Sequence, residues 1–172
     1  MIIVNLVYLL FVVENVGLIK VLFGNILMKE NHLTLNDINV GDYVQEWSEI
    51  PGKWSMPMYI DGIFGDDLYL NFDGNEADPW DAKIKDVFDI PIDWGILTHF
   101  GFFEIDNHLF QIEVGEWLLT VHVFKVCNTF LSNGMLANKN GKVVLLGEVD
   151  SIRMLQHKFY DETKQPPKLT FE

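Results

Sequence analysis

The chain has 172 residues, of which 49% are hydrophobic and 13% aromatic, enough for the packed core of one domain or of two very small ones. It carries 25 acidic and 12 basic residues, and Arg153 is its only arginine. Duplex nucleic acid is bound mainly through lysine and arginine side chains, so direct nucleic-acid binding is not expected. Cys127 is the only cysteine. The chain therefore has neither an intramolecular disulfide nor a cysteine-based zinc site, and a cytoplasmic location is expected.

Residues 1–27 differ from the rest, because they are almost wholly apolar and carry only the charges of Glu14 and Lys20. They lack the positive start and small-residue cleavage site of a signal peptide. A membrane span needs about 20 apolar residues, and Glu14 interrupts this run. Met28 resembles a natural translation start, so we expect residues 1–27 to be translated upstream sequence. A membrane anchor and a packed hairpin are the alternatives.

Residues 33–90 have the pattern of a small β-domain. Short apolar runs alternate with glycine turns and with one acidic loop, Asp73–Asp81. Four or five short strands within about 60 residues predict a strongly bent sheet or an SH3-like small β-barrel. The predicted strands are one beginning at Asp42, then Met58–Phe64, Leu68–Phe72 and Ile84–Ile90.

A proline corner and a short helix are predicted next. The residue before Pro91 is pushed into extended backbone, and Asp93 can cap the first free amides of a helix. Trp94, Leu97 and Phe100 share one face of that helix. Gly101 follows as the residue that can take a left-handed turn. The stretch predicts a short helix that joins two β-rich segments.

Residues 91–172 are expected to hold this joint helix, an antiparallel β-meander and one C-terminal helix packed on the sheet. Period-2 alternation and turn dipeptides place three strands at Phe102–Ile105, His108–Val114 and Trp117–Val126. Asn133-Gly134 and Asn140-Gly141 are predicted turns around a polar loop, followed by a strand at Lys142–Leu146. The helix is predicted over Glu148–Thr163, with Ile152, Leu155, Phe159 and Tyr160 on its apolar side. The fold class is therefore α+β, and the two halves can belong to one domain.

Three segments carry a family resemblance. Ile38–Val44 resembles the pattern LRIGNYV, Ile90–Phe102 resembles IPLTEEWLLKFGF with Asp93 at the capping threonine, and the chain around Leu155–Thr163 resembles VHQLQNLYFALTGEEL. These patterns belong to a family of small proteins from gut Bacteroidales and their phages or mobile elements. The resemblance covers roughly Leu35 to the end of the chain. It implies a mobile-element context and assigns no activity, and Arg153-Met154 departs from the family's His-Gln.

No catalytic or metal-binding cluster is predicted. The five histidines show no metal-ligand spacing, although His108 and His122 lie on adjacent predicted strands. The acidic loop fails the register of an EF-hand calcium loop, because Ala77 and Ile84 occupy ligand positions. Cys127 and His122 point to opposite faces of one strand, which excludes an activated thiol. No cofactor is expected, and a metal-dependent hydrolase using the acidic loop is kept as an alternative.

The candidate binding residues are aromatic and acidic. Trp47, Trp54 and Trp80 lie in or beside polar loops, with Asp78 and Asp81 close in sequence. Exposed aromatics beside acidic groups suit a protein partner, and the alternative is that they close the ends of a small barrel. The leading hypothesis is a non-enzymatic protein-interaction module. The second is an acidic nucleic-acid mimic that inhibits a basic nucleic-acid-binding protein.

Overall fold

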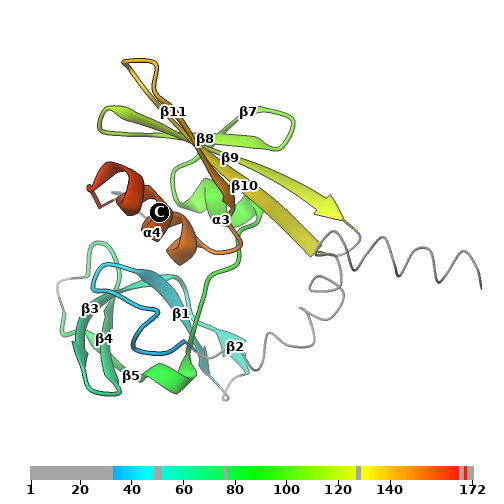
Figure 1. Ribbon diagram of the computed structural model, residues 1–172. Helices are drawn as coiled ribbons and strands as arrows, with labels where there is room; N and C mark the ends of the chain where they lie inside the picture. Colours follow the sequence, from blue (N-terminus) through cyan, green and yellow to red (C-terminus); the bar gives the residue numbers. More distant parts are fainter. Residues whose placement is uncertain (1–32, 49–51, 76, 127–128, 167–168, 170–172) are drawn as a thin grey trace, which may run out of the picture. The chain divides into compact units, whose positions relative to one another are not determined.

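The computed structural model describes residues 33–48, 52–75, 77–126, 129–166 and 169, which belong to one compact unit, His32–Glu172 (Figure 1). The hypotheses on residues 1–27 and on Cys127 lie outside the described residues. None of the helices in the described part of the chain has the length and apolar character needed to cross a bilayer.

The first sheet is a curled half-barrel. It has the order β2-β1-β3-β4-β5, and β6 pairs with β1. Val44, Ile60, Leu68, Leu70 and Val87 are completely buried on its concave side. Side chains on alternate positions meet there because successive residues of a strand point to opposite faces. The strands are β1 (Tyr43–Ser48), β2 (Lys53–Trp54), β3 (Met58–Phe64), β4 (Asp67–Asn71), β5 (Trp80–Lys83) and β6 (Val87–Phe88).

The predicted strand Ile84–Ile90 is only partly formed. Ile84–Asp86 is a 3-10 turn, η1, and only β6 pairs with β1. The acidic loop ends earlier than predicted, since β5 begins at Trp80 and pairs with β4. β5 alternates a buried Ala82 with exposed Asp81 and Lys83, and such charged positions are typical of an edge strand.

The joint helix α3 (Trp94–His99) confirms the prediction. The Asp93 carboxylate accepts the Ile96 N–H at 2.8 Å, which satisfies one of the free amides of the first turn. Gly101 has φ +79°, a conformation that favours glycine. The next N–H, of Phe102, then returns to the Leu97 carbonyl at 3.0 Å. Leu97 and Phe100 are completely buried, so α3 is fixed in the core by the face that its spacing predicts.

The second sheet is an antiparallel meander as predicted, but it has five strands in sequence order, β11-β10-β9-β8-β7, because β10 was not predicted (Figure 1). β9 has the predicted bounds. The Asn140-Gly141 turn is also confirmed, because Gly141 has φ +83° and its N–H bonds to the Asn138 carbonyl. The strands are β7 (Phe103–Asp106), β8 (Leu109–Val114), β9 (Trp117–Val126), β10 (Thr129–Asn138) and β11 (Val143–Glu148).

The predicted turn at Asn133-Gly134 is wrong. Both residues lie inside β10, where Gly134 pairs with Val121. A Cβ on Gly134 would lie 3.2 Å from the side chain of Leu146 and 3.5 Å from that of Leu155. The absence of a side chain at Gly134 therefore lets Leu146 pack closely on the strand, and the predicted polar loop is a strand.

The C-terminal helix α4 (Ile152–Thr163) begins four residues later than predicted. Ser151 caps it by accepting the Met154 N–H at 3.2 Å, and Val149 and Asp150 form an extended connection. Leu155 and Phe159 are completely buried in the core that contains Leu136 of the meander, so the helix packs on this sheet as predicted. Tyr160 was predicted on the apolar side but is 49% exposed.

Candidate partner-binding surface

Trp47 and Trp54 lie against each other. They are paired residues of β1 and β2, and their ring centroids are 4.8 Å apart. Ser55 holds β2 in place, because its Oγ accepts the Glu46 N–H and its N–H donates to the Glu46 carbonyl, both at 2.9 Å. The ring of Phe88 lies 5.1 Å from that of Trp54. Trp54 is 42% exposed at the edge of this aromatic cluster.

Trp80 belongs to β5, and its side chain reaches the face of β1 opposite to Trp47. It pairs with Leu70, whose side chain is buried in the concave core, and it is 60% exposed. Its indole N–H donates to the carboxylate of Glu46. The side chains of Glu46 and Trp47 leave the strand on opposite faces. The structure therefore brings Trp47 and Trp54 together and connects Trp80 to the same strand through Glu46.

The Glu46 carboxylate is held in an unfavourable setting. Partial burial raises its pKa, the hydrogen bond from Trp80 lowers it, and the nearby charge of Asp86 raises it again. The net direction is upward, because desolvation disfavours the charged form more than one indole donor stabilises it. A cationic side chain placed beside Trp80 would relieve this cost.

Asp78 and Asp81 are both exposed close to Trp80 in sequence. They belong to a strong concentration of charge: residues 33–90 contain thirteen acidic and three basic side chains, whereas residues 91–172 contain ten and seven. The β-unit thus carries a net charge of −10. Such a field attracts cationic partners and raises their association rate.

The acidic loop has a partner that the sequence did not reveal. The Tyr43 hydroxyl donates to Asp73 Oδ2 at 2.8 Å and to the Leu169 carbonyl at 3.1 Å.

In the described part of the chain, no group of three or more His, Cys, Asp or Glu side chains is placed to hold a metal ion. His108 stacks on Trp94 with centroids 4.4 Å apart, and His122 pairs with Leu109 across the sheet.

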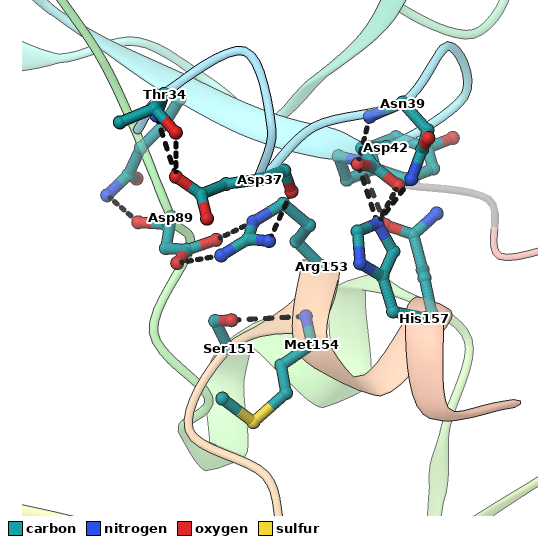
Figure 2. Close-up of polar contacts among 12 residues, drawn as sticks. Thr34, Asp37, Asn39, Asp42, Asp89, Ser151, Arg153, Met154 and His157 are labelled. Carbon is teal, nitrogen blue, oxygen red and sulfur yellow. Dashed lines mark hydrogen bonds and ion pairs between the residues drawn. The ribbon is translucent and has the colours of Figure 1, made fainter. Parts of the chain in front are cut away.

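A polar cluster joins α4 to the first sheet and its loops (Figure 2). The only arginine, Arg153, forms two hydrogen bonds to the carboxylate of Asp89, at 2.7 and 2.8 Å. Its Nη1 also donates to the Asp37 carbonyl at 2.5 Å. Burial disfavours the charged guanidinium, but the hydrogen bond and charge of Asp89 outweigh it and raise the pKa of Arg153. Hydrogen bonds from Thr34 lower the pKa of the Asp37 carboxyl.

One turn along α4, two more side chains complete the contact. Gln156 accepts the Tyr43 N–H at 2.9 Å and donates to the Gly41 carbonyl at 3.0 Å. His157 Nε2 lies 2.8 Å from Asp42 Oδ2 (Figure 2). The sequence analysis missed these residues. Gln156 stands within the predicted apolar stripe of the helix, and a polar residue in such a stripe is the signal that indicates a buried hydrogen-bond partner.

These contacts explain how α4 is used. Its apolar face enters the core of the meander. Gln156 and His157 bind the start of β1 and the residues before it, and Arg153 joins Asp37 to Asp89, which follows β6. The cluster uses its polar atoms internally, so it is a structural joint. The surface that offers aromatic and acidic groups outward is the one around β1 and β5. Comparison with family models, with curated proteins and with solved structures finds no match to this chain.

Proposed function

We propose that the chain is a non-enzymatic protein-interaction module whose β-unit, residues 33–90, binds a basic segment of another protein. The observation that carries this proposal is the exposure of two tryptophans, Trp80 at 60% and Trp54 at 42%, on a unit with a net charge of −10. Large aromatic side chains are the usual anchors of protein interfaces. Arginine and lysine side chains bind both aromatic faces and carboxylates.

The architecture proposed for this unit is an SH3-like small barrel. The return of β6 to β1 after the 3-10 turn supports it, because this pairing brings the last strand of the curled sheet beside the first. The indoles then lie on both sides of β1. The resemblance to proteins of gut Bacteroidales and their phages favours an accessory role in a mobile element, in the cytoplasm.

Binding of a labelled peptide of alternating arginine and glycine, followed by fluorescence anisotropy, tests the proposal. We expect saturable binding that weakens as salt is raised, because exposed charges are screened. Trp54→Ala and Trp80→Ala should each weaken binding about tenfold. Phe64→Ala is the matched control, since Phe64 is 68% exposed on the same unit but its partner Asp67 places it on the face of the sheet opposite to Trp80. Absence of binding at low salt contradicts the proposal.

The second candidate, a nucleic-acid mimic, is favoured by the concentration of carboxylates on one unit. It predicts a different pattern in the same experiment. Binding would depend on salt and on acidic residues such as Asp78 and Asp81, while the tryptophan variants would bind as the unchanged protein does. The ratio of the tryptophan effect to the aspartate effect therefore separates the two candidates.

A further inference from the structure

The chain contains two Asn-Gly dipeptides, Asn133-Gly134 and Asn140-Gly141. Asparagine is thermally labile, and a following glycine, which has no side chain in the way, favours its deamidation. The backbone nitrogen of the glycine attacks the asparagine Cγ, and the new N–Cγ bond closes a five-membered succinimide. The side-chain nitrogen leaves as ammonia and takes up the proton of the glycine N–H through solvent. Water then adds to either carbonyl of the ring and opens it to aspartate or isoaspartate.

The backbone of Asn133-Gly134 is fixed by the sheet. Both residues lie in β10, which is placed between β9 and β11. Gly134 pairs with Val121 on one side and with Gly147 on the other. Ring closure has to turn the Cα–C bond of Asn133 until its Cβ lies in line with the next nitrogen, and in a central strand this rotation breaks ladder hydrogen bonds. The Asn133 side chain itself is exposed, so its protection comes from the backbone and not from burial.

Asn140-Gly141 lies in an exposed turn between β10 and β11. The Gly141 N–H donates to the Asn138 carbonyl, and the Asn140 N–H donates to Asn138 Oδ1, both at 3.0 Å. These bonds are internal to the turn, so it can open while the two strands remain paired. Around Gly141 the space is open, because a Cβ built there would meet no atom of the described chain within 4 Å beyond its immediate neighbours.

The two sites therefore differ in the free energy needed to free the backbone. Local openings range from almost no cost in loops to the full free energy of unfolding in core strands. A reaction that requires opening proceeds in proportion to the population of the open form when opening and closing are fast. We expect deamidation at Asn140 to be at least about a hundredfold faster than at Asn133 in the folded protein.

We propose that Asn140-Gly141 is a site of spontaneous deamidation in the folded protein and that the fold protects Asn133-Gly134. Residues 117–147 contain three lysines and no acidic residue, and the reaction places a carboxylate between two of these lysines, Lys139 and Lys142. Isoaspartate also adds a methylene group to the backbone of the turn.

The added methylene lies inside the connection that the backbone bond from the Asn138 N–H to the Lys142 carbonyl closes at 2.9 Å. In the described sheet β11 is an edge strand that pairs with β10 alone. A longer turn therefore disturbs the register at the start of β11, and this strand is the one that isoaspartate loosens.

Peptide mapping of the full chain by mass spectrometry, during incubation at mildly alkaline pH, tests the site. Cleavage after glutamate releases residues 117–148 as one peptide that contains both dipeptides, because no acidic residue lies between Glu116 and Glu148. The fragment ions then assign the mass increase to Asn133 or to Asn140. Incubation in guanidinium chloride is the matched control, since without the sheet both sites should react at similar rates. Equal rates in the folded protein overturn the proposal, as does a folded Asn140 that reacts no faster than Asn133.

Amide hydrogen exchange tests the effect on β11. Asn140→Asp carries the new charge on an unchanged backbone, and Asn140→Gln closes the larger ring so slowly that it should keep its amide. After incubation, the unchanged protein should exchange the amide hydrogens of β11 faster than either variant does. Equal exchange in all three overturns the loosening of β11. Neither experiment bears on peptide binding by the β-unit, which the tryptophan variants test separately.

Discussion

Gln156 offers the sharpest test of how α4 is held against the β-unit. Replacing it with leucine keeps the volume but removes both hydrogen bonds, the one from the Tyr43 N–H and the one to the Gly41 carbonyl. Tyr43 is only 5% exposed, so its N–H has no access to water and loses its partner outright. An unsatisfied buried donor costs about 1–3 kcal/mol. Gly41 is exposed, and its carbonyl can bind water instead.

The free energy of unfolding should therefore fall by about 2–3 kcal/mol in Gln156→Leu. For a chain of this size the midpoint of thermal unfolding should fall by about 5–10 °C. Urea unfolding followed by circular dichroism measures the free energy, and thermal unfolding followed in the same way measures the midpoint. Glu162→Leu is the matched control, because it places the same side chain on the exposed face of the same helix. A free energy of unfolding for Gln156→Leu within about 0.5 kcal/mol of the unchanged protein would refute the assigned role of the amide.

The variant Gln156→Glu adds a test by pH. The protonated acid can donate to the Gly41 carbonyl as the amide does, whereas the carboxylate would meet that carbonyl with lone pairs only. The folded pKa of this carboxyl is therefore raised above its unfolded value of about 4.3. The variant should therefore keep its full stability below the unfolded pKa of about 4.3 and lose stability, relative to the unchanged protein, as pH rises through the folded pKa. A deficit that does not change between pH 4 and pH 7 would contradict the hydrogen-bond assignment.

Three further predictions concern stability, measured as the free energy of unfolding. A double-mutant cycle of Arg153→Ala and Asp89→Ala should give a coupling of about 1–2 kcal/mol, between the values of surface and buried ion pairs; a coupling of zero would contradict the paired geometry. Gly134→Ala should destabilise by about 1–3 kcal/mol through overpacking, whereas Gly95→Ala, in the exposed part of α3, should stabilise by about 0.5–1 kcal/mol. Glu46→Gln should be more stable than the unchanged protein at pH 7. Because the pKa of Glu46 is raised in the folded protein, the unchanged protein loses stability as pH rises. The advantage of the variant should therefore disappear below about pH 4.3.

The parts of the fold that local chemistry fixes were predictable from the sequence. The joint helix follows from Pro91, Asp93 and Gly101, each of which acts within a few residues. Four of the five meander strands follow from alternation and turn dipeptides, and β9 has the predicted bounds. The Asn140-Gly141 turn needs only a backbone that tolerates positive φ. These features need no knowledge of distant contacts.

The errors arise where contacts between residues far apart in the sequence determine the local structure. Asn133-Gly134 has the composition of a turn, but both residues lie in β10, and Leu146 packs so closely on Gly134 that a Cβ there would lie 3.2 Å from its side chain. The start of α4 was placed too early because Glu148 fits a helix pattern. The chain instead remains extended until Ser151, which pairs with Pro91 in an isolated β-bridge. Local propensity gives way to tertiary packing at both places.

The candidate surface was predictable in composition and not in arrangement. Exposed tryptophans beside carboxylates could be identified from the sequence, and Trp54 and Trp80 are indeed exposed. Their distribution over two faces of β1 depends on the register, which pairs Trp47 with Trp54 and Leu70 with Trp80. A shift of one residue would reverse each side chain to the opposite face, and no local signal fixes that register.

The polar cluster on α4 explains why so much of the acidity remains at the surface. Arg153 and His157 are the side chains through which α4 bonds to carboxylates of the β-unit, those of Asp89 and Asp42. Those two carboxylates are thus used to position the helix, and Asp73 accepts the Tyr43 hydroxyl. The β-unit itself has only three basic side chains for its thirteen acidic ones. Most of its negative charge therefore has no cation within the unit to neutralise it, and this is the charge that would steer the proposed basic partner towards Trp54 and Trp80.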